Sequence, residues 1–278
     1  MSSGPEVFRL ELGDLSVEGA SRAGEETWFR VDPPGLAFDV GRGPNRLLGA
    51  KAYCLSHGHL DHLAGLPFLL SQRRMHRLGP VHIFCPVEIV EALGAYLAGA
   101  ERLEGVEYQV EIRGLHPGEG VELGRLRLEA FATDHVVPSR GYHLFSRKHR
   151  LAKHLEGLSR SELLARKAAG EELSEAVERL ELSFCGDTGP GVFELEPRIF
   201  SARVLMVECT FLGEGFRESA REYGHLHLED LAARMADFEN EELVLFHLSR
   251  RHRRRELENA VAARLPGLKP RVHLVADR

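Results

Sequence analysis

A chain of 278 residues with 43% hydrophobic and 28% charged residues has the composition of a soluble globular protein, which excludes a largely disordered chain. Its formal net charge of −6 excludes a surface that is basic throughout, so any nucleic-acid site must be a local basic patch. The length suffices for one large core, and we expect a single domain over residues 1–278.

The chain contains four cysteines, each in an apolar run and none in a CxxC pair: Cys54, Cys85, Cys185 and Cys209. This usage predicts small core residues in a reducing compartment. The first residues lack a basic segment followed by an apolar one, so we expect no signal peptide. No run approaches the roughly 20 apolar residues that span a bilayer. A cytoplasmic protein without a membrane partner is expected.

Alternating apolar residues and intervening turns predict short strands in the first fifty residues, which would form an antiparallel meander: 7–12, 15–19, 27–31 and 36–40. Helical spacing follows over 63–78 and ends at Gly79-Pro80. The remaining pattern predicts strands over 81–85, 106–113, 125–132 and 243–246, and helices over 87–97 and 253–264. Two mixed sheets with helices on their outer faces satisfy this order.

The segment Ser56–His62 places three histidines and an aspartate directly after the apolar run 52–55. Imidazole and carboxylate ligands suit a borderline divalent ion such as Zn²⁺, and one loop at a strand end is able to aim them at one point. We therefore predict that His57, His59, Asp61 and His62 bind metal. The alternative is a histidine-rich surface loop.

The pattern His-x-His-x-Asp-His resembles the signature of the metallo-β-lactamase superfamily. The resemblance implies an α/β fold, a four-layer αβ/βα sandwich of two mixed sheets. It also implies two metal ions, which hydrolases hold roughly 3.5–4 Å apart. Asp39 ends the predicted strand 36–40, and an aspartate there commonly orients the ligand loop in the superfamily. A simple turn aspartate before Gly41 is the alternative.

Further ligands are expected at the ends of later strands: His135, Asp187 and His247. Asp187 lies in a Gly-Asp-Thr-Gly turn and has two oxygens, so we predict that it bridges the ions; a turn without a metal role is the alternative. One ion would be surrounded by His57, His59, His135 and Asp187. The other would be surrounded by Asp61, His62, Asp187 and His247. We expect two Zn²⁺, with Mn²⁺ or another divalent metal as the alternative.

A series of motifs narrows the resemblance: residues 38–43, 56–62, 64–67, 135–142, 186–188, 208–211, 224–225 and 247–249. In this order they are similar to the short form of the ribonuclease Z family, whose members are metal-dependent endonucleases that trim the 3′ end of precursor tRNA. The similarity runs from about residue 18 to 255. It implies a precursor tRNA substrate and a homodimer.

The resemblance also implies roles for residues outside the metal set. Asp61 would accept a proton from the attacking water, while His225, kept protonated by Glu208, would stabilise charge and protonate the leaving 3′ oxygen. Arg251 and Ser139 would contact a substrate phosphate. The alternative for Glu208 is an acid that merely ends a strand, and for His225 a histidine that merely precedes a helix. For the arginines around Arg251 the alternative is a run of charges exposed to solvent.

The sequence departs from the family between the Gly-Tyr and Gly-Asp-Thr motifs. Typical members have a protruding arm there, rich in glycine and basic residues, that clamps the tRNA elbow. Residues 147–181 instead predict a short helical insertion in which acids nearly match bases. This leaves two alternatives to tRNA processing: a hydrolase of small phosphodiesters or other esters, and a metal-holding binding protein. The histidine of Gly224-His225 also lacks the usual Ser-Thr after it, and Cys209 replaces the more common alanine.

Overall fold

The structure, a computed structural model, describes residues 7–276, without the side chains of residues 148, 149, 176 and 214. Its strands form two seven-stranded sheets, and in each sheet the strands lie side by side in chain order. The first sheet consists of β1 (Phe8–Glu11), β2 (Ser16–Arg22), β3 (Glu26–Asp32), β4 (Leu36–Phe38), β5 (Ala52–Cys54), β6 (Val81–Pro86) and β7 (Val110–Leu115). The second consists of β8 (Gly120–Leu123), β9 (Leu126–Ala132), β10 (Arg140–Leu151), β11 (Ser174–Phe184), β12 (Val204–Glu208), β13 (Glu242–Phe246) and β14 (Arg271–Leu274).

Both sheets are mixed, as expected. β1 to β4 pair antiparallel, which confirms the predicted meander, and β4 to β7 pair parallel. In the second sheet β8 to β11 pair antiparallel and β11 to β14 parallel. The C-terminal ends of β9, β11, β12 and β13 consequently lie at one edge of this sheet. That edge carries the predicted strand-end residues.

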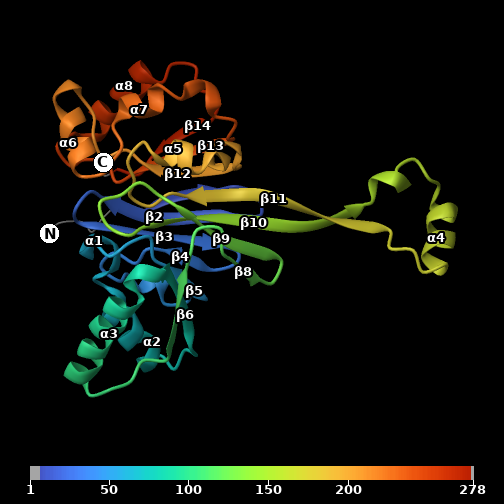
Figure 1. Cartoon of the computed structure of the whole chain (residues 1–278), viewed down its shortest axis with the longest axis horizontal. Helices are drawn as coiled ribbons and strands as arrows, with labels where there is room; N and C mark the ends of the chain where they lie inside the picture. Colours follow the sequence, from blue (N-terminus) through green and yellow to red (C-terminus); the bar gives the residue numbers. More distant parts are fainter. Residues whose placement is uncertain (1–6, 277–278) are drawn as a thin grey trace.

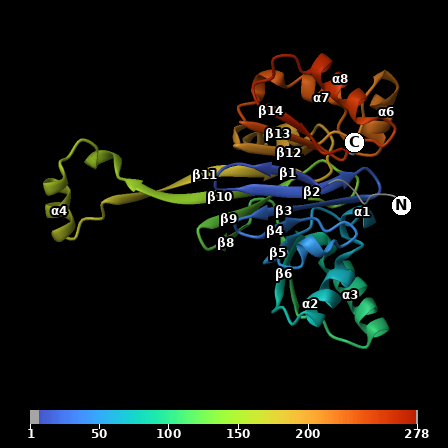
Figure 2. The ribbon, with the colours of Figure 1, turned by 180° about the vertical axis from the view of Figure 1, so that it is seen from behind.

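Three apolar clusters define the four layers (Figure 1 and Figure 2). One fills the space between the sheets, where the rings of Phe29, Phe184 and Phe246 contact one another. A second cluster covers the outer face of the first sheet and a third that of the second sheet. All four cysteines are buried and unpaired, as predicted. The sandwich of two mixed sheets with outer helices is therefore confirmed.

Helices cover the two outer faces. The first sheet carries α1 (Leu60–Leu63), α2 (Leu66–Met75) and α3 (Val90–Glu104), and the second carries α5 (Val192–Leu195), α6 (Arg217–Glu222), α7 (Leu228–Ala232) and α8 (Arg254–Arg264). The helix predicted over 63–78 is shorter in the structure, where α2 begins at Leu66 and ends at Met75. Gly65 precedes it and packs against the backbone of Gly43 with no room for a side chain. Among the described residues, no helix is both long and apolar enough to cross a membrane.

The prediction of short helices over residues 147–181 was wrong for most of the segment. β10 and β11 continue as a paired ribbon as far as Leu151 and Ser174, beyond the rest of the sheet. Only η3 (Lys153–Leu155) and α4 (Arg160–Ala168) are helical, and they lie at the tip. The segment protrudes from the body as an arm (Figure 1). Since β10 begins at the edge where β9, β11, β12 and β13 end, the arm leaves from the opposite edge.

Candidate metal centre

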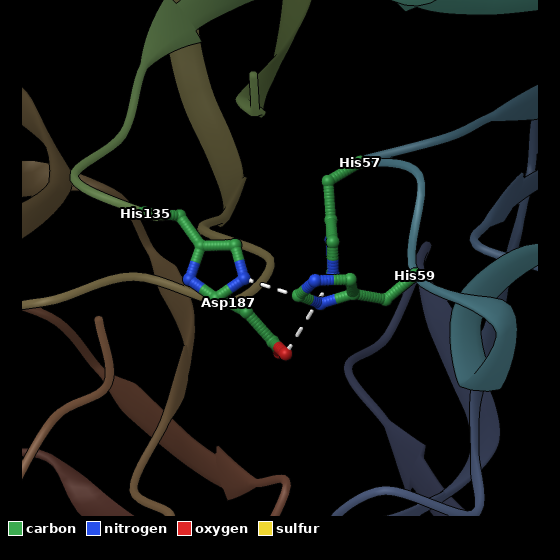
Figure 3. Close-up of side chains that lie close together, drawn as sticks. All are labelled: His57, His59, His135 and Asp187. Carbon is green, nitrogen blue, oxygen red and sulfur yellow. Dashed lines mark hydrogen bonds and ion pairs between the residues drawn. The ribbon is translucent and has the colours of Figure 1, made fainter. Parts of the chain in front are cut away.

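Four of the predicted ligands come together from two sides of the sandwich. His57 and His59 lie on the loop after β5, whereas His135 and Asp187 follow β9 and β11 in the other sheet (Figure 3). One ligand atom from each of the four lies within 4.8 Å of those of the other three. Nε2 of His135 lies 3.4 Å from Nδ1 of His59, and Nε2 of His57 lies 3.8 Å from Asp187 Oδ2. These four residues form the first ligand group.

Asp61, His62 and His247 form a second ligand group, with donor atoms again within 4.8 Å of one another. The Oδ2 atom of Asp187 lies 3.3 Å from Nε2 of His62 and 3.4 Å from Nε2 of His247. The Asp187 carboxylate thus contacts both groups. This is the position that a bridging carboxylate would occupy.

The buried polar atoms at the centre fit a cation. His57 and His62 are fully buried and Asp187 is 2% exposed. Among the described residues, Nε2 of His57, Nε2 of His62 and Oδ1 of Asp187 have no hydrogen-bond partner. Unpaired buried polar atoms are costly, and three that converge on one place indicate that a ligand completes them. A set of imidazoles and carboxylates suits a divalent metal ion.

Hydrogen bonds at Nδ1 hold four of the histidines so that Nε2 faces the centre. His62 donates to Asp39 Oδ2 (2.8 Å), His57 to the Ser56 hydroxyl (2.9 Å), and His135 to the Gly224 carbonyl (2.8 Å). Nδ1 of His247 lies 2.8 Å from the Thr210 hydroxyl. Such partners fix the tautomer and the ring orientation of a metal-binding histidine.

Asp39 holds the ligand loop 56–62 in place through hydrogen bonds. Its Oδ1 accepts the Ser56 backbone N–H (2.7 Å), and its Oδ2 accepts both the Ser56 hydroxyl and His62 Nδ1. Asp39 and His247 have φ values of 55° and 54°, in the left-handed region that side chains other than glycine seldom adopt. Backbone strain of this kind gathers at functional sites, where the surrounding contacts impose it.

The protonation states also suit metal binding. Burial lowers the pKa of His57, His59 and His135, which keeps these imidazoles neutral and their lone pairs available. Burial likewise acts to lower the pKa of His62, but the carboxylates of Asp187 and Asp39 raise it well above its usual value. A cation between His62 and Asp187 would replace that proton.

Glu208 and His225 lie beside the two groups as a close pair. Oε1 of Glu208 is 2.6 Å from Nδ1 of His225, and Glu208 also accepts hydrogen bonds from the Thr188 N–H and from the Thr210 N–H and hydroxyl. Burial acts to lower the pKa of His225, yet the Glu208 carboxylate raises it to about 9. His225 remains 13% exposed, so a substrate is able to reach it.

Comparison with known proteins shows the family. A beta-lactamase superfamily domain matches residues 41–248. The protein tRNase Z TRZ1 of Arabidopsis thaliana is 34% identical over 267 residues, which cover 95% of each chain. The chain belongs to the ribonuclease Z family. The chloroplastic tRNase Z TRZ2 of the same plant is 34% identical, over 91% of this chain and 72% of its own.

Solved structures of low identity agree with the ribonuclease Z fold. The short form of human tRNase Z superposes with a TM-score of 0.59 at 20% identity, over 84% of this chain and 92% of its own. The metallo-β-lactamase fold protein YhfI of Bacillus subtilis gives a TM-score of 0.63 at 15% identity, over 95% and 96%. Both show the fold alone.

The two residues expected to contact phosphate in a ribonuclease Z differ in their surroundings. Arg251 is exposed, and its guanidinium lies 5.0 Å from the centre of the Phe216 ring. Ser139 is only 5% exposed, and its hydroxyl lies 2.5 Å from that of Thr133, which does not favour a phosphate contact. The neighbouring Arg250 and Arg254 pair with Glu25 and Glu258, as a solvated charge run would.

Two sets of hydrogen bonds at the site were not predicted from the sequence. Thr210 links Glu208 to His247, and so joins the acid–histidine pair to the second ligand group. The Asp134 carbonyl and carboxylate accept N–H groups of Gly189 and Gly191, which ties the His135 loop to the Asp187 loop. The Glu-x-Thr motif of the ribonuclease Z family was the only available signal for Thr210. Nothing in the sequence pointed to Asp134.

Proposed function

We propose that this protein is a ribonuclease Z, a metal-dependent endonuclease that removes the 3′ trailer of precursor tRNA. The observation that carries the proposal is the pair of ligand groups sharing Asp187, with the Glu208–His225 pair beside them. Phosphodiester hydrolysis needs an activated water, stabilisation of charge and a proton for the leaving oxygen. The relatives named tRNase Z favour RNA over small phosphodiesters and over a binding protein.

We propose two Zn²⁺ ions, with Mn²⁺ or another divalent metal as the alternative. His57, His59 and His135 would hold one ion, Asp61, His62 and His247 the other, and Asp187 both. When bound, such a pair lowers the pKa of a water molecule and offsets negative charge on a phosphate. The buried atoms of His57, His62 and Asp187 that lack partners support this assignment.

Asp61 is the proposed proton acceptor. Its side chain is 16% exposed, and its Oδ2 lies 3.4 Å from Nε2 of His247, so it faces both the ligand group and the solvent. Burial acts to raise its pKa, but the hydrogen bond from His247 lowers it overall. Asp61 is therefore ionised at neutral pH and able to take up a proton.

His225 is the proposed proton donor to the leaving 3′ oxygen. Glu208 keeps this imidazole charged at neutral pH and fixes Nδ1, which leaves Nε2 for the substrate. Arg251 is the proposed phosphate contact, because it is exposed and no acidic partner neutralises it among the described residues. The assignment of Ser139 to a phosphate has less support, since that residue is buried.

The arm is the proposed contact with the body of the tRNA. The side chains of Arg160 and Lys167 on α4 are exposed and have no hydrogen-bond or ion-pair partner within residues 7–276. Unpaired cations at the tip of a protruding ribbon suit a phosphate backbone. We also propose a homodimer, because the arm leaves from the edge opposite the ligand groups. The arm of one copy and the metal centre of another would then engage one substrate.

A cytoplasmic location is likewise proposed, and the four unpaired buried cysteines support a reducing compartment. The single domain over residues 1–278 also stays a proposal.

The deciding experiment incubates the metal-loaded protein with a 3′-extended precursor tRNA. Cleavage next to the discriminator nucleotide is expected, and the His225→Ala variant should lose it. His76→Ala, which removes an exposed histidine at the end of α2, is the matched control and should cleave normally. Turnover of bis-p-nitrophenyl phosphate by a protein that leaves the tRNA intact would instead support a small-phosphodiester hydrolase.

A further inference from the structure

A large cleft lies at the edge of the sandwich opposite the metal centre, at the root of the arm. Its cavity volume is about 1070 Å³. One wall comes from the first sheet, with the β3–β4 turn and Lys51. The other comes from the β8–β9 turn and from the positions where β10 and β11 leave the body. None of these residues belongs to the ligand groups or to the Glu208–His225 pair.

The floor of this cleft contains a buried guanidinium group, that of Arg203, which pairs with two carboxylates but has one N–H group without a hydrogen bond among the described residues. The side chain of Arg203 is 9% exposed; its Nε donates to Glu181 (2.7 Å) and its Nη1 to the Leu12 carbonyl (3.1 Å). Within the described part of the chain its buried Nη2 has no hydrogen-bond partner, although it forms an ion pair with the exposed carboxylate of Asp14 at 3.6 Å. A buried charged donor without an acceptor is unfavourable, and an oxygen atom of a ligand would satisfy it.

Two further cations stand at the rim without partners. Lys51, from the start of β5, and Arg125, from the β8–β9 turn, are exposed and line the cleft. Within residues 7–276 their side chains have no hydrogen-bond or ion-pair partner. Arg147 also lines the cleft but pairs with Glu122 and Glu178. Each wall thus carries one exposed cation without such a partner, in a cleft whose lining also includes the carboxylates of Asp14 and Glu181.

Apart from Ser146, the rest of the lining is apolar and includes two proline rings. Pro33 and Pro34 lie on one wall, Leu123 and Leu126 on the other, and Leu15 is nearby. A ligand suited to this lining has an anionic end and an apolar, planar body. Binding sites of this size for small molecules usually combine such an apolar lining with a few placed polar groups.

We propose that this cleft binds a phosphorylated organic anion of nucleotide size. Its phosphate would contact Lys51 and Arg125 and compete with Asp14 for Nη2 of Arg203, and its planar body would lie against Pro33 and Pro34. The proposal is independent of the chemistry at the metal centre. A ligand here would contact the first sheet and the root of the arm together.

Calorimetric titration of the metal-loaded protein with adenosine 5′-monophosphate tests the proposal. The Lys51→Ala/Arg125→Ala variant should bind this probe at the cleft at least about tenfold more weakly, because two charge-assisted contacts are lost. The Arg74→Ala/Lys269→Ala variant removes the same charge from exposed sites elsewhere and should bind as the wild type does. Hydrolysis of bis-p-nitrophenyl phosphate should be unchanged in both variants.

Since the metal centre also attracts phosphate, hydrogen exchange is used to locate the probe. In the wild type, the probe should protect the backbone amides next to Pro33 and Pro34 and those of the turn 123–126 from exchange. This protection should be absent in Lys51→Ala/Arg125→Ala. Equal binding by that variant and the wild type, with no protection at the turn, would overturn the proposal. So would equally tight binding of uncharged adenosine, which lacks the phosphate. Neither outcome depends on whether precursor tRNA is cleaved.

Discussion

At the scale of single residues, Asp187 has the most demanding position in the metal centre. It is 2% exposed, yet it carries a negative charge, because the histidines around it hold its pKa well below the usual value against the effect of burial. One of its oxygens contacts His62 and His247 and also lies near His57. Replacing Asp187 would remove a carboxylate ligand from both ligand groups.

Asp61 offers a cleaner test of chemistry, because it is partly exposed and makes few structural contacts. Asp61→Ala should lower kcat for precursor tRNA by roughly 10²-fold to 10⁴-fold, the usual contribution of an acid–base group, and by more if an ion is lost. The circular dichroism spectrum should stay close to wild type. Asp14→Ala, at the opposite edge, is the matched control. Retained activity in Asp61→Ala would refute the proposed proton acceptor.

Glu208 controls the charge of His225, and this predicts a shift in pH dependence. His225 acts in its protonated form, so activity should fall as the pH rises through its pKa, which is about 9 and which bound cations would lower. In Glu208→Gln the carboxylate that raises this pKa is absent, while burial still lowers it. The alkaline limb of kcat for tRNA cleavage should therefore move to lower pH.

The leaving group provides the control for Glu208→Gln. p-Nitrophenolate leaves without being protonated, so hydrolysis of bis-p-nitrophenyl phosphate should be much less affected than tRNA cleavage. An equal loss with both substrates would mean that Glu208 supports the structure through Thr188 and Thr210 instead of tuning His225.

The residues that converge on the metal centre were predictable, because each histidine or aspartate follows an apolar strand directly. Asp39 was also predictable, since it ends a strand before the loop that it holds. The roles of Thr210 and Asp134 were not predictable. Thr210 contacts His247, 37 positions away, and Asp134 contacts Gly191, 57 positions away. The spacing of residues along a strand or helix does not indicate contacts between such distant positions. At Ser139 the position fits a motif but the side chain is buried, so the predicted phosphate contact has little structural support.

At the scale of elements, the arm is the main difference between expectation and structure. Leucine, alanine, glutamate and arginine dominate residues 147–181, and these residue types favour helices. Strand pairing prevails near the body, where Arg147 and Arg150 of β10 form ion pairs with Glu178 and Glu175 of β11. Cross-strand pairs of this kind stabilise a ribbon that local propensity would not select. β8 and β14, each of four residues, were not predicted.

The positive charge at the tip of the arm should affect the binding of precursor tRNA but not the hydrolysis of a small substrate. Arg160→Ala/Lys167→Ala should raise KM for precursor tRNA roughly threefold to tenfold and reduce its dependence on salt, because two phosphate contacts are lost. Turnover of bis-p-nitrophenyl phosphate should not change. Arg74→Ala/Lys269→Ala serves again as the charge-matched control. An unchanged KM and salt dependence for tRNA would argue against the arm as the docking element.

At the scale of the whole molecule, the ligand groups join the two sheets. His57 to His62 extend from the first sheet, whereas His135, Asp187 and His247 extend from the second. The sandwich was predictable from the strand order and from the superfamily resemblance. The side-by-side order of all fourteen strands in chain sequence was not, since apolar spacing alone does not determine which strands pair.

Removal of metal should therefore affect stability as well as activity. Ions that bind only the folded state stabilise it, so dialysis against a chelator should lower the Tm by about 5 °C or more and abolish hydrolysis. Adding Zn²⁺ should restore both. In the Asp187→Asn variant, the difference in Tm between the metal-loaded protein and the protein dialysed against chelator should be smaller. A Tm that is the same with and without chelator would contradict a metal site that joins the sheets.

The location of His247 has a consequence for how the protein is made. Synthesis proceeds from the N-terminus, so the loop 56–62 leaves the ribosome long before β13 and His247. Until then, the second ligand group lacks one of its members and cannot close. Completion of the metal centre is thus a late event in biogenesis. A chain truncated before β13 would have most of the ligands but not the finished site, so completion of the metal centre requires that synthesis has passed His247.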